Sequence, residues 1–203
     1  TLPDPASESG RIDWRALLRR VLPHVDLFVP SLDETAYMLD PVRGAAVRDR
    51  SAAGVPLGGC SADDVQRLCA QLTEMGTAVV MLKLGKQGAY LQATRDAARL
   101  AACGRAGPSD PAAWAGAALQ AACFTVEVAG TTGAGDCTIA GFLAAVAQGL
   151  GPADALRMAV GVGSTSVEGR DGARDLPPLA RIAERLATAW PRDPSPVPFP
   201  HVV

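Results

Sequence analysis

Residues 123–150, CFTVEVAGTTGAGDCTIAGFLAAVAQGL, decide the fold. The first six residues largely alternate apolar and polar side chains and are rich in β-formers, so they predict a strand. The following GTTGAGD contains three glycines, which are typical of a tight turn. Ile139, Phe142 and Val146 then recur at helical spacing, and the helix that they predict ends at Gly149. A strand, a glycine-rich turn and a helix in direct succession indicate an α/β protein.

The glycine-rich turn carries the strongest functional signal. Its glycines let the backbone turn sharply and present successive N–H groups at the positive end of a helix dipole, which is an anion-binding arrangement. The carboxylate at the end of the turn, Asp136, would repel a bound phosphate, but it can instead take a proton from a hydroxyl group that attacks phosphorus. The structural alternative stays open: Asp136 favours the helix N-terminus, and the glycines only permit close packing.

Further strands and helices extend the pattern on both sides of this turn. Residues 25–29 and 78–84 are short apolar runs typical of buried strands, and the turn LGKQG joins the second run to a third strand at 89–92. Strands that alternate with helices predict a layered α/β fold with a mostly parallel sheet. Helices are predicted at 13–21, 32–39, 61–75, 152–160 and 177–190. A loop is predicted at 41–60, a loop or insertion with some local helix at 94–121, and a proline-rich tail at 191–203.

Composition excludes several classes of protein. The 203 residues are 48% hydrophobic and 20% charged, which is ordinary for a globular protein. With 19 basic and 21 acidic residues the net charge is −2, so the sequence predicts a small-molecule partner rather than nucleic acid or an anionic membrane. No apolar run approaches the roughly 20 residues of a membrane span. Five cysteines without a C-x-x-C pair or histidines at zinc spacing favour a reducing, cytoplasmic location.

Two nucleotide-binding motifs are absent from the sequence. No G-x-x-x-x-G-K-[ST] occurs, because Gly85-Lys86 is followed by Gln87. No G-x-G-x-x-G opens a helix after an early strand, which argues against a dehydrogenase with a nicotinamide cofactor.

The segment GTTGAGDCTIAGFLAAVAQGL, residues 130–150, resembles the D-T-T-G-A-G-D-x-F-x-A-G-F signature of the ribokinase-like (PfkB) carbohydrate kinases. The resemblance implies that Asp136 is the catalytic base and that Gly133, Ala134 and Gly135 form the anion hole. It also places Thr131 and Thr132 beside the bound nucleotide.

Two other segments resemble motifs of the same family in the same order. PSLDE, ending at Glu34, is similar to P-N-x-x-E, whose glutamate helps to organise Mg²⁺ and phosphate. VVMLKLGKQGAYL, residues 79–91, is similar to the strand and L-G-x-x-G nucleotide loop, which implies that Lys83, Gly85 and Gly88 bind the cofactor. The alternatives are a first-turn helix acid for Glu34, and a hairpin turn with solvated lysines for the loop.

A fourth segment, MAVGVGSTSVEG at residues 158–169, resembles the adenine side of the family's nucleotide pocket. The resemblance makes Gly163 and Ser164 cofactor-binding candidates, because small side chains let a flat base approach. Close helix packing explains the same residues equally well.

The sequence departs from the family pattern at two positions. Gly130 stands in place of the first aspartate of the signature, which argues against a monovalent-cation site, and Ser31 stands in place of the asparagine. The matches also begin after the part of the family that supplies the sugar-holding aspartate and the lid. We therefore expect an incomplete ribokinase-like three-layer domain over residues 1–203, without the N-terminal part of the fold and the lid.

The resemblance implies an ATP- and Mg²⁺-dependent phosphotransferase that acts on a hydroxyl group of a sugar or nucleoside. A homodimer is compatible with it. The alternative is a non-catalytic nucleotide-binding module derived from the same family, which the two departures and the missing part favour.

Overall fold

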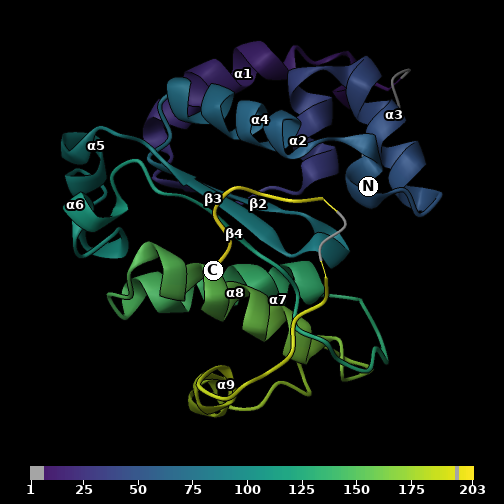
Figure 1. Cartoon of the computed structure of the whole chain (residues 1–203). Helices are drawn as coiled ribbons and strands as arrows, with labels where there is room; N and C mark the ends of the chain where they lie inside the picture. The colour runs from purple at the N-terminus through teal and green to yellow at the C-terminus, as the bar shows by residue number, and fades with distance from the viewer. Residues whose placement is uncertain (1–6, 195–196) are drawn as a thin grey trace.

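A computed structural model describes residues 7–194 and 197–203, and these form a sheet with helices on both faces (Figure 1). The strands are β1 (Leu27–Phe28), β2 (Val79–Lys83), β3 (Ala89–Ala93) and β4 (Ala118–Ala121), in the spatial order β1-β2-β3-β4. Helices α1 to α4 cover one face and α7 and α8 the other, as predicted for an α/β fold. None of the helices described is long and apolar enough to span a bilayer.

The sheet is mixed, which corrects the prediction of a mostly parallel one. In the described residues β1 and β2 are the only parallel pair, with Leu27 opposite Val79. The β2–β3 and β3–β4 pairs are antiparallel. For β2 and β3 the cause is the short turn that joins them, because a parallel neighbour requires a long crossover connection.

Strand β2 is apolar on both faces because both faces are covered. Val79 and Met81 belong to the core beneath α7 and α8, whereas Val80 and Leu82 belong to the core beneath α4. All four are fully buried. This explains why the sequence reads here as a continuous apolar run rather than an alternating one.

The first helical layer contains one helix that the sequence analysis missed. A loop was expected at 41–60, yet α3 spans Pro41–Ala52. The Asp40 side chain accepts hydrogen bonds from the N–H groups of Val42 and Arg43, and Pro41 occupies the first helical position. The layer consists of α1 (Trp14–Val21), α2 (Leu32–Leu39), α3 and α4 (Ala62–Glu74), with short 3₁₀ turns at Ser9–Arg11, Leu22–His24 and Pro56–Gly59.

The second layer packs two long helices closely against each other. Helix α7 spans Ala134–Ala147 and α8 spans Pro152–Ser166. A Cβ atom added to Gly141 would lie 2.8 Å from the Val162 side chain, so only glycine permits this approach. Beyond α8 lies α9 (Leu179–Leu186), which is shorter than the helix predicted at 177–190.

The last strand of the sheet lies upstream of its predicted position. The sequence predicted a loop or insertion with some local helix at 94–121 and a strand at 123–128. The structure instead has α5 (Ala97–Ala101), a 3₁₀ turn at Gly104–Ala106, α6 (Pro111–Trp114) and β4, while 123–128 forms only an isolated bridge between Phe124 and Arg192. Four residues, ALQA, form the strand because they pair in register with β3, although their β-propensity is low.

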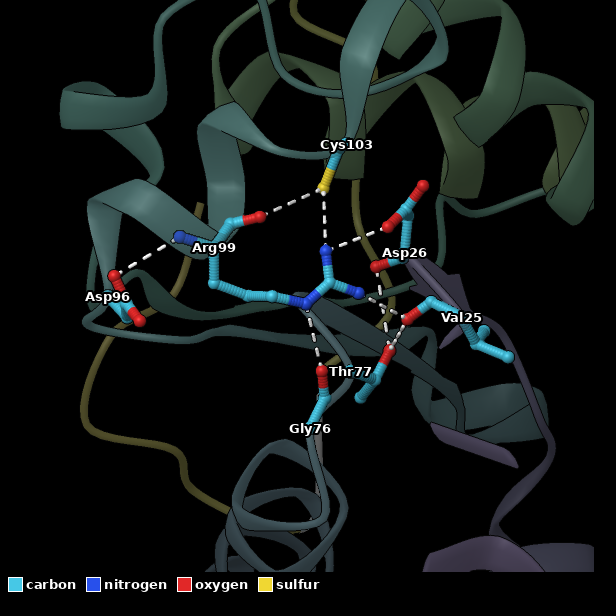
Figure 2. A network of polar contacts seen from close by, with 7 residues as sticks. All are labelled: Val25, Asp26, Gly76, Thr77, Asp96, Arg99 and Cys103. Carbon is cyan, nitrogen blue, oxygen red and sulfur yellow. Dashed lines mark hydrogen bonds and ion pairs between the residues drawn. The ribbon is translucent and has the colours of Figure 1, made fainter. Parts of the chain in front are cut away.

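A network around Arg99 ties the α5 segment to the sheet (Figure 2). The Arg99 guanidinium donates to the Asp26 carboxylate at 2.8 Å and to the carbonyls of Val25 and Gly76 at 3.1 and 3.0 Å. Thr77 Oγ1 also donates to the Val25 carbonyl, at 2.8 Å. Because these residues precede β1 and β2, the network lies at the amino ends of the two parallel strands.

The C-terminal residues return to the sheet instead of forming the predicted tail. Val202 pairs with Gln120 of the edge strand β4, and the Phe199 ring stacks on the Tyr90 ring with centroids 5.6 Å apart. Figure 1 shows this segment crossing the sheet in yellow. Residues 195 and 196 lie outside the described part of the chain.

Candidate functional site

The carboxyl ends of β1 and β2 meet the N-terminus of α7 at one edge of the sheet. Directly after β1, Ser31 bridges Lys83 at the end of β2, and the Lys83 N–H donates to the Pro30 carbonyl at 2.9 Å. In α/β sheets ligands bind beyond the carboxyl ends of the parallel strands. The Arg99 network lies at the opposite ends, so it is distant from this site along the strands.

A cavity of about 460 Å³ opens at this edge. Its walls combine three segments that the sequence analysis selected separately: the residues after β1, the β2–β3 turn and the glycine-rich turn. The segment that follows α3 lines the cavity as well, and in it Leu57 has a left-handed backbone with φ of 50°. The lining includes Ser31, Asp33, Lys83, Gly85, Gln87 and Gly135.

Within the part of the chain that the structure describes, the glycine-rich turn leaves two backbone donors unpaired at the start of α7. Gly133 precedes α7 in the left-handed conformation, with φ of 78°, which a residue with a side chain rarely adopts. The Ala134 N–H donates to the Thr131 carbonyl at 3.2 Å, whereas the N–H groups of Gly135 and Asp136 have no acceptor among the residues described. Unpaired amides at a helix N-terminus are the donors that bind phosphate groups.

Two charged side chains lie at this turn. A Cβ atom added to Gly135 would lie 3.5 Å from Lys83 Nζ, so the ammonium group is adjacent to the turn. Asp136, in the first turn of α7, is exposed and follows the glycine that lines the cavity. The turn therefore has a cation beside it, unpaired amides and an exposed carboxylate, although Asp136 is not itself among the residues that line the cavity.

The start of the turn is held by the end of α8. The N–H groups of Ala129 and Gly130 both donate to the Val167 carbonyl, at 2.8 and 3.2 Å. A Cβ atom added to Gly130 would lie 3.1 Å from the Arg170 carbonyl oxygen, so an aspartate would be crowded here. Glycine at this position therefore avoids a tight contact with the backbone after α8.

Glu34 helps to start α2 and also carries charge toward the site. Its carboxylate accepts from the Ser31 N–H at 2.8 Å, while Ser31 Oγ accepts from the Glu34 N–H at 3.2 Å. Partial burial raises the pKa of Glu34, but these hydrogen bonds and the charge of Lys83 outweigh burial, so the pKa lies below its ordinary value. Glu34 therefore carries a negative charge at neutral pH.

Asp33 lines the cavity although the sequence analysis did not select it. Burial and the adjacent Glu34 raise its pKa, against the opposing effects of Ser51 and Arg48. No sequence signal distinguishes Asp33 from an ordinary first-turn helix acid, because only the cavity shows which way it faces.

The β2–β3 turn uses its two glycines differently. Gly85 and Gly88 both have positive φ, of 58° and 87°. A Cβ atom added to Gly85 would meet no atom within 4 Å, whereas one added to Gly88 would lie 1.9 Å from the Ala121 carbonyl oxygen. Gly85 lines the cavity, and Gly88 lets the turn pack against the end of β4.

Five of the cofactor-binding candidates do not line the cavity: Gly88, which packs against β4, and Gly163, Ser164, Thr131 and Thr132. Gly163 faces α7, where an added Cβ atom would lie 2.2 Å from Thr138 Oγ1. Ser164 is buried, and its hydroxyl accepts from the Phe124 N–H at 3.1 Å. Both therefore have a packing role. Thr131 and Thr132 are exposed at the glycine-rich turn.

The residues of the site fit Mg²⁺ that arrives with phosphate groups. Within residues 7–194 and 197–203 no cluster of three or more acidic, histidine or cysteine residues is arranged to hold a metal ion. Mg²⁺ at nucleotide sites needs only one or two carboxylates, because phosphate oxygens and water complete its coordination. Glu34, ionised and close to Lys83, could supply one of them.

Comparison with known proteins agrees with this geometry. The model of the pfkB family carbohydrate kinases matches residues 2–178. No match was found among curated proteins. *Arabidopsis thaliana* ribokinase, solved with ribose and ATP, superposes with a TM-score of 0.60 at 19% identity over 84% of this chain and 44% of that chain.

Two bacterial structures are similar to the same extent. Aminoimidazole riboside kinase from *Salmonella enterica*, solved with aminoimidazole riboside and an ATP analogue, gives a TM-score of 0.56 at 18% identity, covering 86% of this chain and 46% of that one. A putative ribokinase II from *E. coli*, solved with ATP and Mg²⁺, gives 0.56 at 22% identity, covering 84% and 42%. At these identities the similarity shows the fold, and the chain spans less than half of each matched structure.

Proposed function

Because the chain belongs to the pfkB family of carbohydrate kinases, we propose that it contributes the nucleotide site and the catalytic base of an ATP-dependent phosphotransferase acting on a hydroxyl group of a sugar or nucleoside. One observation carries the proposal. Lys83 and Gly85 of one motif and Gly135 of another line a single cavity at the carboxyl ends of the parallel strands.

Asp136 is the proposed general base. Its carboxylate is exposed and stands next to the amides that would hold the transferred phosphoryl group. Taking the proton of the acceptor hydroxyl makes the oxygen a better nucleophile, and such assistance contributes about 10²- to 10⁴-fold to a rate.

The amides of Gly135 and Asp136 and the Lys83 ammonium are the proposed stabilisers of negative charge. Helix α7 orients the amides and β2 places Lys83 beside them, so these donors stand at the site before substrate binds. Glu34 would hold Mg²⁺, which supplies neutralisation of phosphate charge when it is bound.

The first test compares two aspartates at equivalent helical positions. Asp136 and Asp154 are each the third residue of their helix, α7 and α8. Asp136→Asn and Asp154→Asn therefore lose the same helix-dipole interaction, but only Asp136 adjoins the cavity lining. We expect Asp136→Asn to lower kcat by about 10²- to 10⁴-fold and Asp154→Asn to leave it unchanged.

The assay measures ADP formation over a panel of sugars and nucleosides, together with titration of an ATP analogue and Mg²⁺. Asp136→Asn should leave nucleotide affinity largely intact, whereas Gly135→Val should abolish it by filling the space beside Lys83. Full activity of Asp136→Asn would refute the assignment of the base.

A non-catalytic nucleotide-binding module is the second candidate. Gly130 and Ser31 favour it, because both depart from the family signature. The same assay separates the two: nucleotide binding without ADP formation from any acceptor supports the module.

A further inference from the structure

We propose that Gln120 and the C-terminal strap, residues 197–203, form a positioning device for the β2–β3 turn, Leu84–Gly88. The proposal rests on the proposed function, in which this turn binds nucleotide. The strap lies beyond the region that the family model matches, which ends at residue 178. The family assignment therefore does not describe the strap.

Gln120 anchors the turn from β4. Its side chain is fully buried, and its Nε2 donates to the Gln87 carbonyl at 2.9 Å. The backbone bonds inside the turn engage the carbonyls of Leu84, Gly85 and Gly88, so the Gln87 carbonyl is left for this external donor. Because Gln87 lines the cavity, the bond acts directly on a wall of the candidate site.

The rest of the turn also packs against the end of β4 and the residues after it. Gly88 has no space for a Cβ atom against the Ala121 carbonyl, and Cys123 Sγ lies 3.5 Å from the Gly85 carbonyl oxygen. A shift of residues 120–123 would therefore move the turn. The position of the cavity wall is coupled to the position of this edge strand.

The strap is hydrogen-bonded to the edge strand β4 at Gln120, the residue that anchors the turn. The Gln120 N–H donates to the His201 carbonyl at 2.8 Å, and the Val203 N–H donates to the Gln120 carbonyl at 2.9 Å. Phe199, nearly buried, stacks on Tyr90, which is paired with Gln120 across the sheet. The strap therefore holds Gln120 by both of its backbone polar groups and by a neighbouring ring.

A second contact secures the chain that leads to the strap. Trp190 stacks on Phe124 with centroids 4.2 Å apart, and the guanidinium of Arg192 lies 4.4 Å from the centroid of the same ring. The Thr125 N–H also donates to the Pro191 carbonyl at 2.9 Å. These contacts hold Phe124 and Thr125, which follow β4. The C-terminal residues therefore contact both β4 and the segment after it.

Burial of an amide indicates that Gln120 has a role besides packing. Its Oε1 is buried without a hydrogen-bond partner in the described residues. An unsatisfied buried polar atom costs free energy, whereas leucine would fill a similar volume without this cost. The bond from Nε2 to the turn is what the amide provides and an apolar side chain would not.

The test uses three variants of the full chain. Gln120→Leu removes the anchor. Phe199→Ala combined with Val203→Pro weakens the strap by removing the stacked ring and one N–H donor. Gln92→Leu is the matched control, because Gln92 lies on the neighbouring strand β3 and its amide is directed to Thr73 rather than to the turn.

Amide hydrogen exchange of Gln87 and Gly88 gives a readout that does not depend on nucleotide. Both amides are bonded within the turn, to Leu84 and Gly85. We expect their exchange to rise about 3- to 10-fold in Gln120→Leu and in the strap variant, relative to the core amides Val80 and Met81, and to stay unchanged in Gln92→Leu. Normalising to the core amides separates loosening of the turn from global destabilisation.

Titration of an ATP analogue with Mg²⁺ provides the functional readout. We expect affinity to fall about 3- to 10-fold in the first two variants, and where turnover is measurable we expect KM for ATP to rise while kcat changes little. Turn exchange that is unchanged, or that rises equally in Gln92→Leu, would overturn the proposal. If the wild-type chain binds no nucleotide, the proposed function fails, and hydrogen exchange still decides whether Gln120 positions the turn.

Discussion

Gly88 and Gly85 offer a controlled comparison at the scale of single residues. Both have positive φ, but only Gly88 lies against backbone, with 1.9 Å from its added Cβ to the Ala121 carbonyl oxygen. We expect Gly85→Ala to cost about 1–2 kcal/mol of unfolding free energy from backbone strain alone. Gly88→Ala should cost at least about 1 kcal/mol more, because the turn must also shift. Urea unfolding measures both, and equal costs would contradict the close approach.

The site residues that could be predicted from sequence are those whose motif fixes the backbone. The signature around Asp136 and the turn at Gly85 contain glycines that only tight turns need, and the structure brings Lys83, Gly85 and Gly135 together at one cavity. Small residues inside a helix are ambiguous, and Ser164 proved to bond backbone instead. Gln120 was missed because nothing in ALQA shows that its amide reaches a neighbouring turn.

At the scale of elements, the Arg99 network determines how the α5 segment attaches to the sheet. Its guanidinium satisfies the carboxylate of Asp26 and the carbonyls of Val25 and Gly76, and the Arg99 side chain is 21% exposed. Arg99→Met keeps an apolar stem but removes the donor to the Asp26 carboxylate and the Gly76 carbonyl, while the Val25 carbonyl keeps its bond from Thr77 Oγ1. We expect a loss of about 2–4 kcal/mol of unfolding free energy, measured by urea titration.

The same variant has a clear functional expectation. Because the network lies at the amino ends of β1 and β2, folded Arg99→Met should bind an ATP analogue with wild-type affinity. Arg95→Met, in the same inserted segment but outside the network, is the control and should be near wild type in stability. A lowered nucleotide affinity in the folded Arg99 variant would show that the two ends of the sheet are coupled.

Some helix starts could be predicted from their capping residues, whereas strand pairing could not be predicted from the sequence. Ser31 and Ser61 form the capping boxes that start α2 and α4, and each is visible as a serine followed three residues later by an acid. The prediction of a strand at 123–128 was wrong because alternation indicates β-propensity but does not identify a partner strand. The chain leaves the sheet at Ala122, before these alternating residues begin. The alanine-rich β4 is the segment that pairs in register with β3.

At the scale of the whole molecule, the α/β class followed from local pattern while the direction of the strands did not. A short turn after β2 forces an antiparallel neighbour, and the C-terminal strap then covers the edge of β4. Contacts between residues 120 and 202 join segments far apart in the chain, so no window of sequence contains both. The layering could be derived from periodicity, whereas the cover of that edge required the tertiary structure.

The whole molecule should respond to nucleotide if the cavity is formed before ligand binds. A ligand that binds only the folded state stabilises it by mass action, by about 2.7 kcal/mol at 100 times Kd. For a chain of 203 residues, this corresponds to an increase in Tm of about 5–10 °C. We expect this shift with an ATP analogue and Mg²⁺ by calorimetry, its retention in Asp136→Asn and its loss in Gly135→Val. An equal shift in Gly135→Val would place the nucleotide outside this cavity, and no shift in the wild type would mean that these 203 residues do not form a nucleotide site by themselves.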